Sequence, residues 1–367
     1  MSEGASDAVR NITVGFLIGS YAVTQFISMP LIGALSDHFG RKRVLLWTIF
    51  GAMFSFVLSA LAILIGSLSL LFTSRLLAGL FSGNAGTAMA SIADMSTEQA
   101  KAKNLSLTGV VGGISWIIGP PLGGFLASTT WVIWFDFATP FWFLGILFLI
   151  NLIWIQFSYV ETHQTKEKHD WKQEIKDLGK LSKIPRMSGW LIVSFLFYMG
   201  WFFFVLYYPT LLVQKFGYDQ QQIGYLSGYL SIFWFLGSLI LNRGLTEKID
   251  SERLMLWAIP FTGILILLAS FFETLGGWLV IFPLAALCAS SVWISAMALA
   301  SNIAGTANQG KVFGILQSML SLGLFISPLC TGFLALVNIN SPLWVGAAVL
   351  LGTGVFAIRL HAKESKA

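Results

Sequence analysis

Charged residues are scarce in this sequence. Lys, Arg, Asp and Glu make up 11% of the 367 residues, whereas 56% are hydrophobic and the mean hydropathy is +0.77. A soluble domain carries roughly 25% charged residues. So few charged side chains cannot cover a 40.3 kDa globule in water. The composition therefore excludes a soluble enzyme, a nucleic-acid-binding protein and a secreted disulfide scaffold, and it favours a protein with many membrane-spanning segments.

Cysteine is also rare, with only Cys288 and Cys330, and both lie in apolar stretches. Two such residues support neither a disulfide framework nor a zinc site, and we expect no bound metal. In contrast, the 36 glycines and 14 tryptophans are typical of membrane helices, which tolerate Gly and place Trp at the lipid interface.

Eleven apolar stretches are long enough to cross the roughly 30 Å hydrocarbon core as helices. They are residues 11–35, 44–65, 68–93, 105–127, 131–158, 188–213, 222–242, 254–272, 276–301, 312–337 and 341–360. Their long, continuous runs argue against a strand barrel, whose segments alternate over about ten residues. We predict an all-α membrane protein.

The basic residues indicate the orientation. If the turn Arg41–Arg43 is cytoplasmic and each span alternates, nineteen of the 22 basic residues lie inside. Arg10 and Lys215 lie outside, and Arg75 lies within a span. This bias predicts a cytoplasmic C-terminus and an external N-terminus. Residues 1–10 are polar and have no apolar signal region, so we interpret them as the loop after a helix that is not in this chain.

The polar stretch 159–187 divides the chain into a half of five spans, residues 1–158, and a half of six spans, residues 188–367. The stretch itself is either an amphipathic helix on the cytoplasmic face or a solvated linker. Faint repetition between residues 33–46 and 242–256 relates the two halves, and duplicated halves are typical of secondary transporters.

A motif with a specific pattern lies between the first two spans: Gly33-x-x-Ser36-Asp37-x-x-Gly40-Arg41-Lys42-Arg43. It resembles the loop between helices two and three of the major facilitator superfamily. The resemblance implies a bundle of two pseudo-symmetric halves with twelve helices, of which about eleven are present. It also implies an inner gate, formed by Gly33, Asp37, Gly40, Arg41, Lys42 and Asp94. The alternatives are a plain basic turn and an Asp94 that simply ends its helix in water.

Arg75 is the only basic residue within a predicted span. A buried cation is costly, so we expect an interior position and a partner. The surrounding pattern, Leu71-x-x-x-Arg75-x-x-x-Gly79-x-x-x-Gly83, resembles the family's second motif, whose arginine is linked to proton coupling. Alternatively, Arg75 reaches the outer interface with its charged head.

The segment Gly119-Pro120-Pro121-Leu122-Gly123-Gly124 resembles the signature of the drug–proton antiporter branch, which includes tetracycline-resistance exporters. We expect its small residues to let helices pack closely and its prolines to kink the helix. The resemblance assigns the antiporter motif to Gly119, Pro120, Gly123 and Gly124.

Polar and aromatic residues within the spans are candidates for a substrate cavity, although each one can instead hold helices together. The candidates are Tyr21, Gln25, Asn84, Trp116, Tyr198, Trp201, Tyr229, Trp293, Asn302 and Gln317. As a set, amides and aromatic rings suit a bulky, amphipathic ligand that is uncharged or cationic.

A carboxylate at the middle of a span is missing. None of the seventeen acidic residues lies there, although proton coupling needs a protonatable group. Tetracycline-type relatives commonly carry one on their first helix. We therefore expect that the chain begins after that helix, through a misassigned start or a shortened gene.

These features predict a secondary active transporter and not an enzyme. We expect proton-coupled export of small amphipathic compounds by alternating access, with no cofactor and the proton gradient as the energy source. The expected partners are a small-molecule substrate, protons and the lipid bilayer, with no nucleic acid. The chain is expected to be a monomer in the bacterial inner membrane. The alternatives are a nutrient or siderophore transporter with the same fold, and an inactive truncated transporter.

Overall fold

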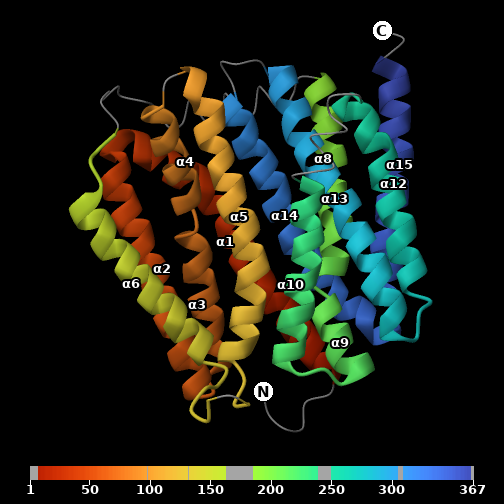
Figure 1. Cartoon of the computed structure of the whole chain (residues 1–367), viewed down its shortest axis with the longest axis horizontal. Coiled ribbons are helices and arrows are strands. Elements are labelled where there is room, and N and C mark those ends of the chain that lie inside the picture. Colours follow the sequence, from red (N-terminus) through yellow and green to blue (C-terminus); the bar gives the residue numbers. More distant parts are fainter. Residues whose placement is uncertain are drawn as a thin grey trace. The chain divides into compact units, whose positions relative to one another are not determined.

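The computed structural model describes residues 7–96, 98–130, 132–162, 185–238, 249–304 and 309–364. Within these ranges the chain forms helices joined by short connections, and it contains no strand (Figure 1). The prediction of an all-α protein is confirmed, and each of the eleven expected spans overlaps one helix or two consecutive helices, although the end of span 222–242 lies outside the described residues.

The chain divides into two compact units, of which the first comprises residues 1–3 and 17–177 and the second comprises residues 4–16 and 178–367. The boundary between residues 177 and 178 lies in the polar stretch predicted to separate two halves. The amphipathic helix considered for this stretch falls mostly on residues 163–184, which are outside the described residues.

The first unit contains most of α1 (Asp7–Phe39), from residue 17 onward. It also contains α2 (Arg41–Leu64), α3 (Leu68–Leu80), α4 (Asn84–Asp94), α5 (Glu98–Leu126) and α6 (Thr139–Ser158). Helix α2 packs along α6 on one side and along α3 and α4 on the other. Small side chains on α2, including Ser55 and Ser59, are fully buried and permit these close contacts.

The second unit contains α8 (Pro185–Val205), α9 (Tyr208–Phe216), α10 (Gln220–Leu236), α12 (Ser251–Ala269), α13 (Leu275–Ala304), α14 (Gln309–Val337) and α15 (Ser341–Glu364). Helix α8 packs against α13, α14 and α15. It contributes Phe197, Tyr198 and Phe204 to the core, where all three side chains are almost completely buried.

Two of the predicted spans are interrupted. Span 68–93 consists of α3 and α4, separated by a turn at residues 81–83. Span 188–213 consists of α8 and α9, and Pro209 in the first turn of α9 has no backbone N–H to continue the ladder of α8.

The span predicted over residues 131–158 begins later than expected, because α6 begins at Thr139. Asp136 Oδ1 accepts hydrogen bonds from the backbone N–H groups of Ala138 and Thr139, both at 2.9 Å. Pro140 occupies the first turn of the helix, where its missing N–H costs nothing. The polar side chain of Asp136 therefore sets the start of α6.

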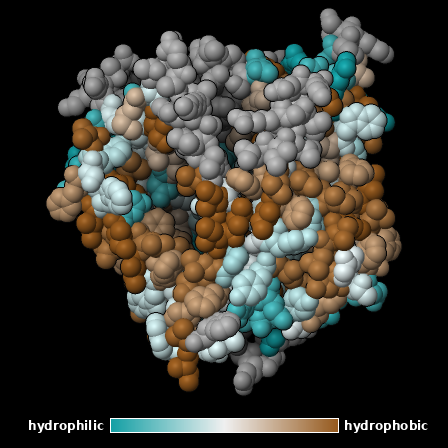
Figure 2. All heavy atoms as spheres, in the orientation of Figure 1, coloured by the Kyte–Doolittle hydropathy of each residue, from teal (hydrophilic) through white to brown (hydrophobic). Residues whose placement is uncertain are grey.

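Many large apolar side chains lie on the outward faces of the helices, and Figure 2 shows such hydrophobic surface. On α6, Trp154 is 69% exposed and Phe157 is 83% exposed. Surface of this kind would be unstable in water but suits contact with lipid. Among the described residues, eight helical segments are long and apolar enough to cross a membrane.

Helices α1 and α3 approach closely at Gly79. A Cβ atom at this position would overlap the carbonyl oxygen of Tyr21 and the Oγ1 atom of Thr24. The Ser28 hydroxyl donates a hydrogen bond of 2.9 Å to the carbonyl oxygen of Gly79, which ties the two backbones together. Only glycine fits this contact, as expected where membrane helices pack through small residues.

We predict that Gly79→Val lowers the free energy of unfolding by about 1–3 kcal/mol, because the added side chain must push α1 away from α3. Unfolding by SDS in mixed micelles measures the loss. Gly352→Val is the matched control, since Gly352 lies within α15 and a Cβ there meets no described atom within 4 Å. Equal losses in the two variants would contradict the close contact at Gly79.

Candidate functional site

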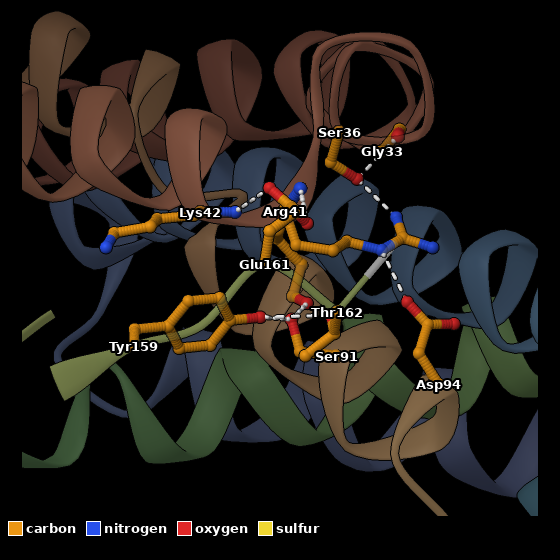
Figure 3. A network of polar contacts seen from close by, with 10 residues as sticks. Gly33, Ser36, Arg41, Lys42, Ser91, Asp94, Tyr159, Glu161 and Thr162 are labelled. Carbon is orange, nitrogen blue, oxygen red and sulfur yellow. Dashed lines mark hydrogen bonds and ion pairs between the residues drawn. The ribbon is translucent and has the colours of Figure 1, made fainter. Parts of the chain in front are cut away.

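A network of charged and polar groups surrounds Arg41 at one end of the first unit (Figure 3). The Arg41 side chain is only 9% exposed, and its Nε atom donates to Asp94 Oδ2 at 3.0 Å. Its Nη1 atom donates to Ser36 Oγ at 2.5 Å, and Ser36 in turn donates to the carbonyl oxygen of Gly33 at 2.8 Å. One guanidinium therefore joins the ends of α1 and α4 to the start of α2.

Glu161 completes this network from the end of α6. Its Oε1 atom accepts from the backbone N–H of Arg41 at 2.9 Å, and its Oε2 atom accepts from that of Lys42 at 3.1 Å. The residue before α2 is Gly40, which has a φ of 95° and no side chain to cap the helix. A carboxylate at a helix N-terminus satisfies free N–H groups and interacts favourably with the helix dipole. Glu161 is therefore the cap of α2, supplied by the segment that follows α6.

Further contacts fasten the end of α6 to its neighbours. The Lys42 ammonium donates to the carbonyl oxygen of Gln156 at 2.9 Å. The Tyr159 hydroxyl donates to Ser91 Oγ of α4 at 2.5 Å and lies 3.2 Å from Thr162 Oγ1 (Figure 3). The ends of α1, α4 and α6 and the start of α2 thus form one connected group, which we call the Arg41 network.

The structure therefore brings together Gly33, Gly40, Arg41, Lys42 and Asp94 of the predicted inner gate. The Asp37 side chain is outside the described residues. Sequence reasoning missed Glu161. A usable signal was present, because an acidic residue follows the apolar stretch of α6 directly, and α2 begins after a glycine that cannot cap it.

Arg75 belongs to α3, and its side chain lies inside the first unit against α2 and α6. Its Nη2 atom donates to Ser59 Oγ at 2.6 Å. Its guanidinium carbon lies 5.5 Å from the ring centre of Phe56 and 5.3 Å from that of Phe141. These positions agree with the expected interior location, but the described residues provide no carboxylate partner for it.

Two cavity candidates of α1 lie near this arginine. The Tyr21 phenol is close enough to Arg75 for an electrostatic interaction, and Gln25 Nε2 donates to the Tyr21 hydroxyl at 3.3 Å. Both residues face α3 at the close contact with Gly79. Asn84, at the start of α4, is half-buried.

Helix α5 carries the segment that resembles the antiporter signature. Pro120 and Pro121 lie inside the helix, which continues to Leu126. A Cβ atom at Gly119 or Gly123 would meet no described atom within 4 Å, so the close helix packing expected there is not observed at these two positions. Trp116, on the same helix, is 62% exposed.

Four aromatic side chains of the second unit form a continuous cluster. The ring centres of Tyr198 and Trp293 are 5.1 Å apart, those of Trp293 and Trp234 are 5.9 Å apart, and those of Trp234 and Trp201 are 5.4 Å apart. Helices α8, α10 and α13 each contribute to this cluster. The structure thus brings three of the predicted cavity residues together and adds Trp234, which sequence reasoning missed.

The remaining cavity candidates do not join the cluster. The Tyr229 hydroxyl donates to the carbonyl oxygen of Leu279 at 3.1 Å, so it ties α10 to α13. Asn302 is exposed near the end of α13, and Gln317 is half-buried in α14. The Gln317 carbonyl oxygen accepts a hydrogen bond of 3.0 Å from Ser321.

The second unit has a polar cluster of its own where α8 and α12 begin and α15 ends. Arg186 forms ion pairs with Glu252 and Glu364. His361 Nδ1 lies 2.8 Å from Glu252 Oε2, and Trp190 Nε1 donates to Glu364 Oε2 at 3.3 Å. Carboxylates again join helix ends to a basic side chain, as in the Arg41 network.

We predict that Glu161→Ala lowers the free energy of unfolding by about 1–2 kcal/mol, because two N–H groups at the start of α2 lose their acceptor. SDS unfolding in mixed micelles measures the change, and Glu161→Gln, which retains one oxygen, should lose less. Glu273→Ala is the control, since this carboxylate is 88% exposed and 3.9 Å from Lys215. A loss no larger for Glu161→Ala than for the control would contradict the capping role.

Comparisons with known proteins agree with this architecture. The family model of the Major Facilitator Superfamily matches residues 5–282 and 244–367. Multidrug resistance protein 2 of Bacillus subtilis is 26% identical over 366 residues, which cover 97% of this chain and 88% of that protein. The class B tetracycline resistance protein of Escherichia coli is 25% identical, with coverage of 96% and 86%.

The solved structure of a D-xylose–proton symporter shares the fold, with a TM-score of 0.75, 16% identity and coverage of 97% of this chain and 89% of that one. The resemblance inferred from the motifs is therefore confirmed over nearly the whole sequence. The chain belongs to the Major Facilitator Superfamily of multi-pass membrane transporters.

Proposed function

We propose that this chain exports small amphipathic compounds across the bacterial inner membrane in exchange for protons. The observation that carries the proposal is its similarity, over nearly its whole length, to multidrug and tetracycline resistance proteins. The lipid-compatible outer surface and the basic residues clustered near Arg41 agree with an inner-membrane protein whose C-terminus is cytoplasmic and whose N-terminus is external. The chain is proposed to work as a monomer, with the proton gradient as its energy source.

The Arg41 network supports a role as a conformational latch. Its contacts join four helix ends through hydrogen bonds and the Arg41–Asp94 ion pair, all of which can break and re-form without any covalent step. Asp94 is 27% exposed, so water can replace the bonds that it makes to Arg41. In alternating access, breaking this latch would release the cytoplasmic ends of the first unit, and re-forming it would close them.

The aromatic cluster of the second unit supports recognition of a bulky apolar compound. Trp234 and Trp293 are partly buried, and each presents a large flat surface with low conformational freedom. Rings of this type bind the apolar part of many ligands without requiring one exact shape. We assign Trp234 and Trp293 to substrate contact in the proposed transporter, with the buried rings of Tyr198 and Trp201 packed behind them.

We predict that expression of this chain in bacteria lacking their own efflux pumps lowers the accumulation of tetracycline or ethidium several-fold. A protonophore should abolish the difference, because the outward movement depends on the proton gradient. Fluorescence of the cells measures accumulation, and cells with an empty vector are the control. Increased accumulation of a tested compound would instead indicate an importer, and no change with any compound would indicate an inactive chain.

We predict that Asp94→Asn reduces this efflux several-fold while the amount of protein in the membrane stays the same. The substitution removes the negative charge that pairs with the nearly buried Arg41 at position 94 and so weakens the closed arrangement of the helix ends. Glu273→Gln, which alters an exposed ion pair of the second unit, should transport normally. Normal efflux by Asp94→Asn would contradict the latch.

A further inference from the structure

The guanidinium of Arg75 has unused binding capacity. A guanidinium carries five N–H donors, and one of those on Arg75 bonds to Ser59 Oγ at 2.6 Å. The Nε atom is buried and has no hydrogen-bond partner among the described residues. Leaving a charged donor without an acceptor is expensive in a low-dielectric interior. We therefore expect that the unpaired Nε donor of Arg75, which costs free energy of folding, serves a function.

The immediate surroundings of Arg75 are aromatic. Phe56 of α2 and Phe141 of α6 lie within 6 Å of the guanidinium, close enough for cation–π attraction. Phe56 also stacks on Phe148, with ring centres 5.3 Å apart and an angle of 17° between the planes. These rings stabilise the positive charge in part, but they offer no acceptor to the Nε atom.

The carboxylates described in the first unit bind groups other than Arg75. Asp94 and Glu161 bind Arg41, and Asp136 binds the start of α6. The Tyr21 phenol lies near Arg75 but is neutral in its ordinary state, so it supplies no negative charge. The described part of the unit thus presents a half-buried cation, with a buried Nε atom, and no carboxylate as its counter-ion.

Unlike Arg75, the described Arg and Lys residues that form ion pairs each have a carboxylate partner. Arg41 has Asp94, Arg186 has Glu252 and Glu364, and Lys215 has Glu273 within 3.9 Å. Lys215 offers a close comparison, because it also lies near an aromatic ring, 5.8 Å from the centre of Trp278, and yet has a carboxylate. At Lys215, therefore, the aromatic neighbour does not replace the counter-ion.

We propose that Arg75 binds the anionic group of an amphipathic aromatic acid, such as a carboxylate, in the first unit. The anion accepts hydrogen bonds from Arg75, with the Tyr21 hydroxyl as a nearby donor, and the apolar body of the ligand packs on Phe56 and Phe141. The inference rests on the proposed function and narrows its substrate class. It also revises the expectation, drawn from the amides and rings alone, of an uncharged or cationic ligand.

The experiment compares two probes of the same shape. Isothermal titration calorimetry measures the binding of 2-naphthoate and of its neutral analogue 2-naphthamide to the purified full chain in lipid nanodiscs. A charge-assisted hydrogen bond predicts that 2-naphthoate binds about tenfold more tightly than 2-naphthamide. In Arg75→Gln the ratio of the two affinities should fall to about one, and in Lys215→Gln, the matched control, it should stay at the wild-type value.

A second variant tests the site without removing the arginine. Ser59→Asp places a carboxylate beside the Nη2 atom, where it competes with the ligand for the same cation. The ratio should again fall to about one, while a cooperative melting transition shows that the variant is folded. This result would separate loss of the site from loss of the fold.

A wild-type ratio near one, no detectable binding of 2-naphthoate, or an unchanged ratio in Arg75→Gln would each overturn the anion site. The titration needs neither a proton gradient nor transport, so its outcome is independent of the accumulation assay. Efflux without preference for 2-naphthoate would leave the proposed function intact and remove only the substrate class. Preferential binding of 2-naphthoate without efflux would support the anion site and contradict the proposed function.

Discussion

Charge in the interior of a membrane bundle must be paired, and this constraint organises both units. Most charged side chains described here lie at helix ends, where water or an opposite charge stabilises them. At the end of the first unit, the nearly buried Arg41 is held by Asp94 and by the hydroxyl of Ser36, while the Glu161 carboxylate occupies the start of α2. Arg75 departs from the rule, since it is interior and has aromatic rings in place of a carboxylate.

The start of α2 shows how one backbone requirement connects several helices. Gly40 adopts a positive φ, which reverses the chain tightly after α1, but a glycine cannot cap the helix that follows. The free N–H groups therefore need an acceptor from elsewhere, and Glu161 at the end of α6 supplies it. A Cβ atom at position 40 would lie 2.5 Å from Glu161 Oε2, so the turn and the cap depend on the same glycine.

Sequence patterns predicted the helices well but not all of their breaks or contacts. The apolar stretches located each span, because crossing the hydrocarbon core requires a minimum length of apolar helix. The late start of α6 depends on Asp136, a polar residue in an otherwise apolar run. Within the candidate sites, the motif around Arg41 was recognisable because its members are close in sequence. Glu161 was missed, since it is 120 residues away from Arg41. Trp234 was missed because nothing in its local sequence distinguishes it from the other tryptophans.

Composition and the positions of the few charges were enough to predict a multi-pass membrane protein and the expected orientation of its spans. These properties follow from the transfer of side chains between water and lipid, which each segment experiences separately. The family was indicated by local motifs such as the one around Arg41. Which polar groups meet was decided only by the tertiary structure. Whether Arg75 finds a carboxylate, a hydroxyl or a ring depends on how α2, α3 and α6 pack, since these helices place Ser59, Phe56 and Phe141 around it from distant parts of the chain.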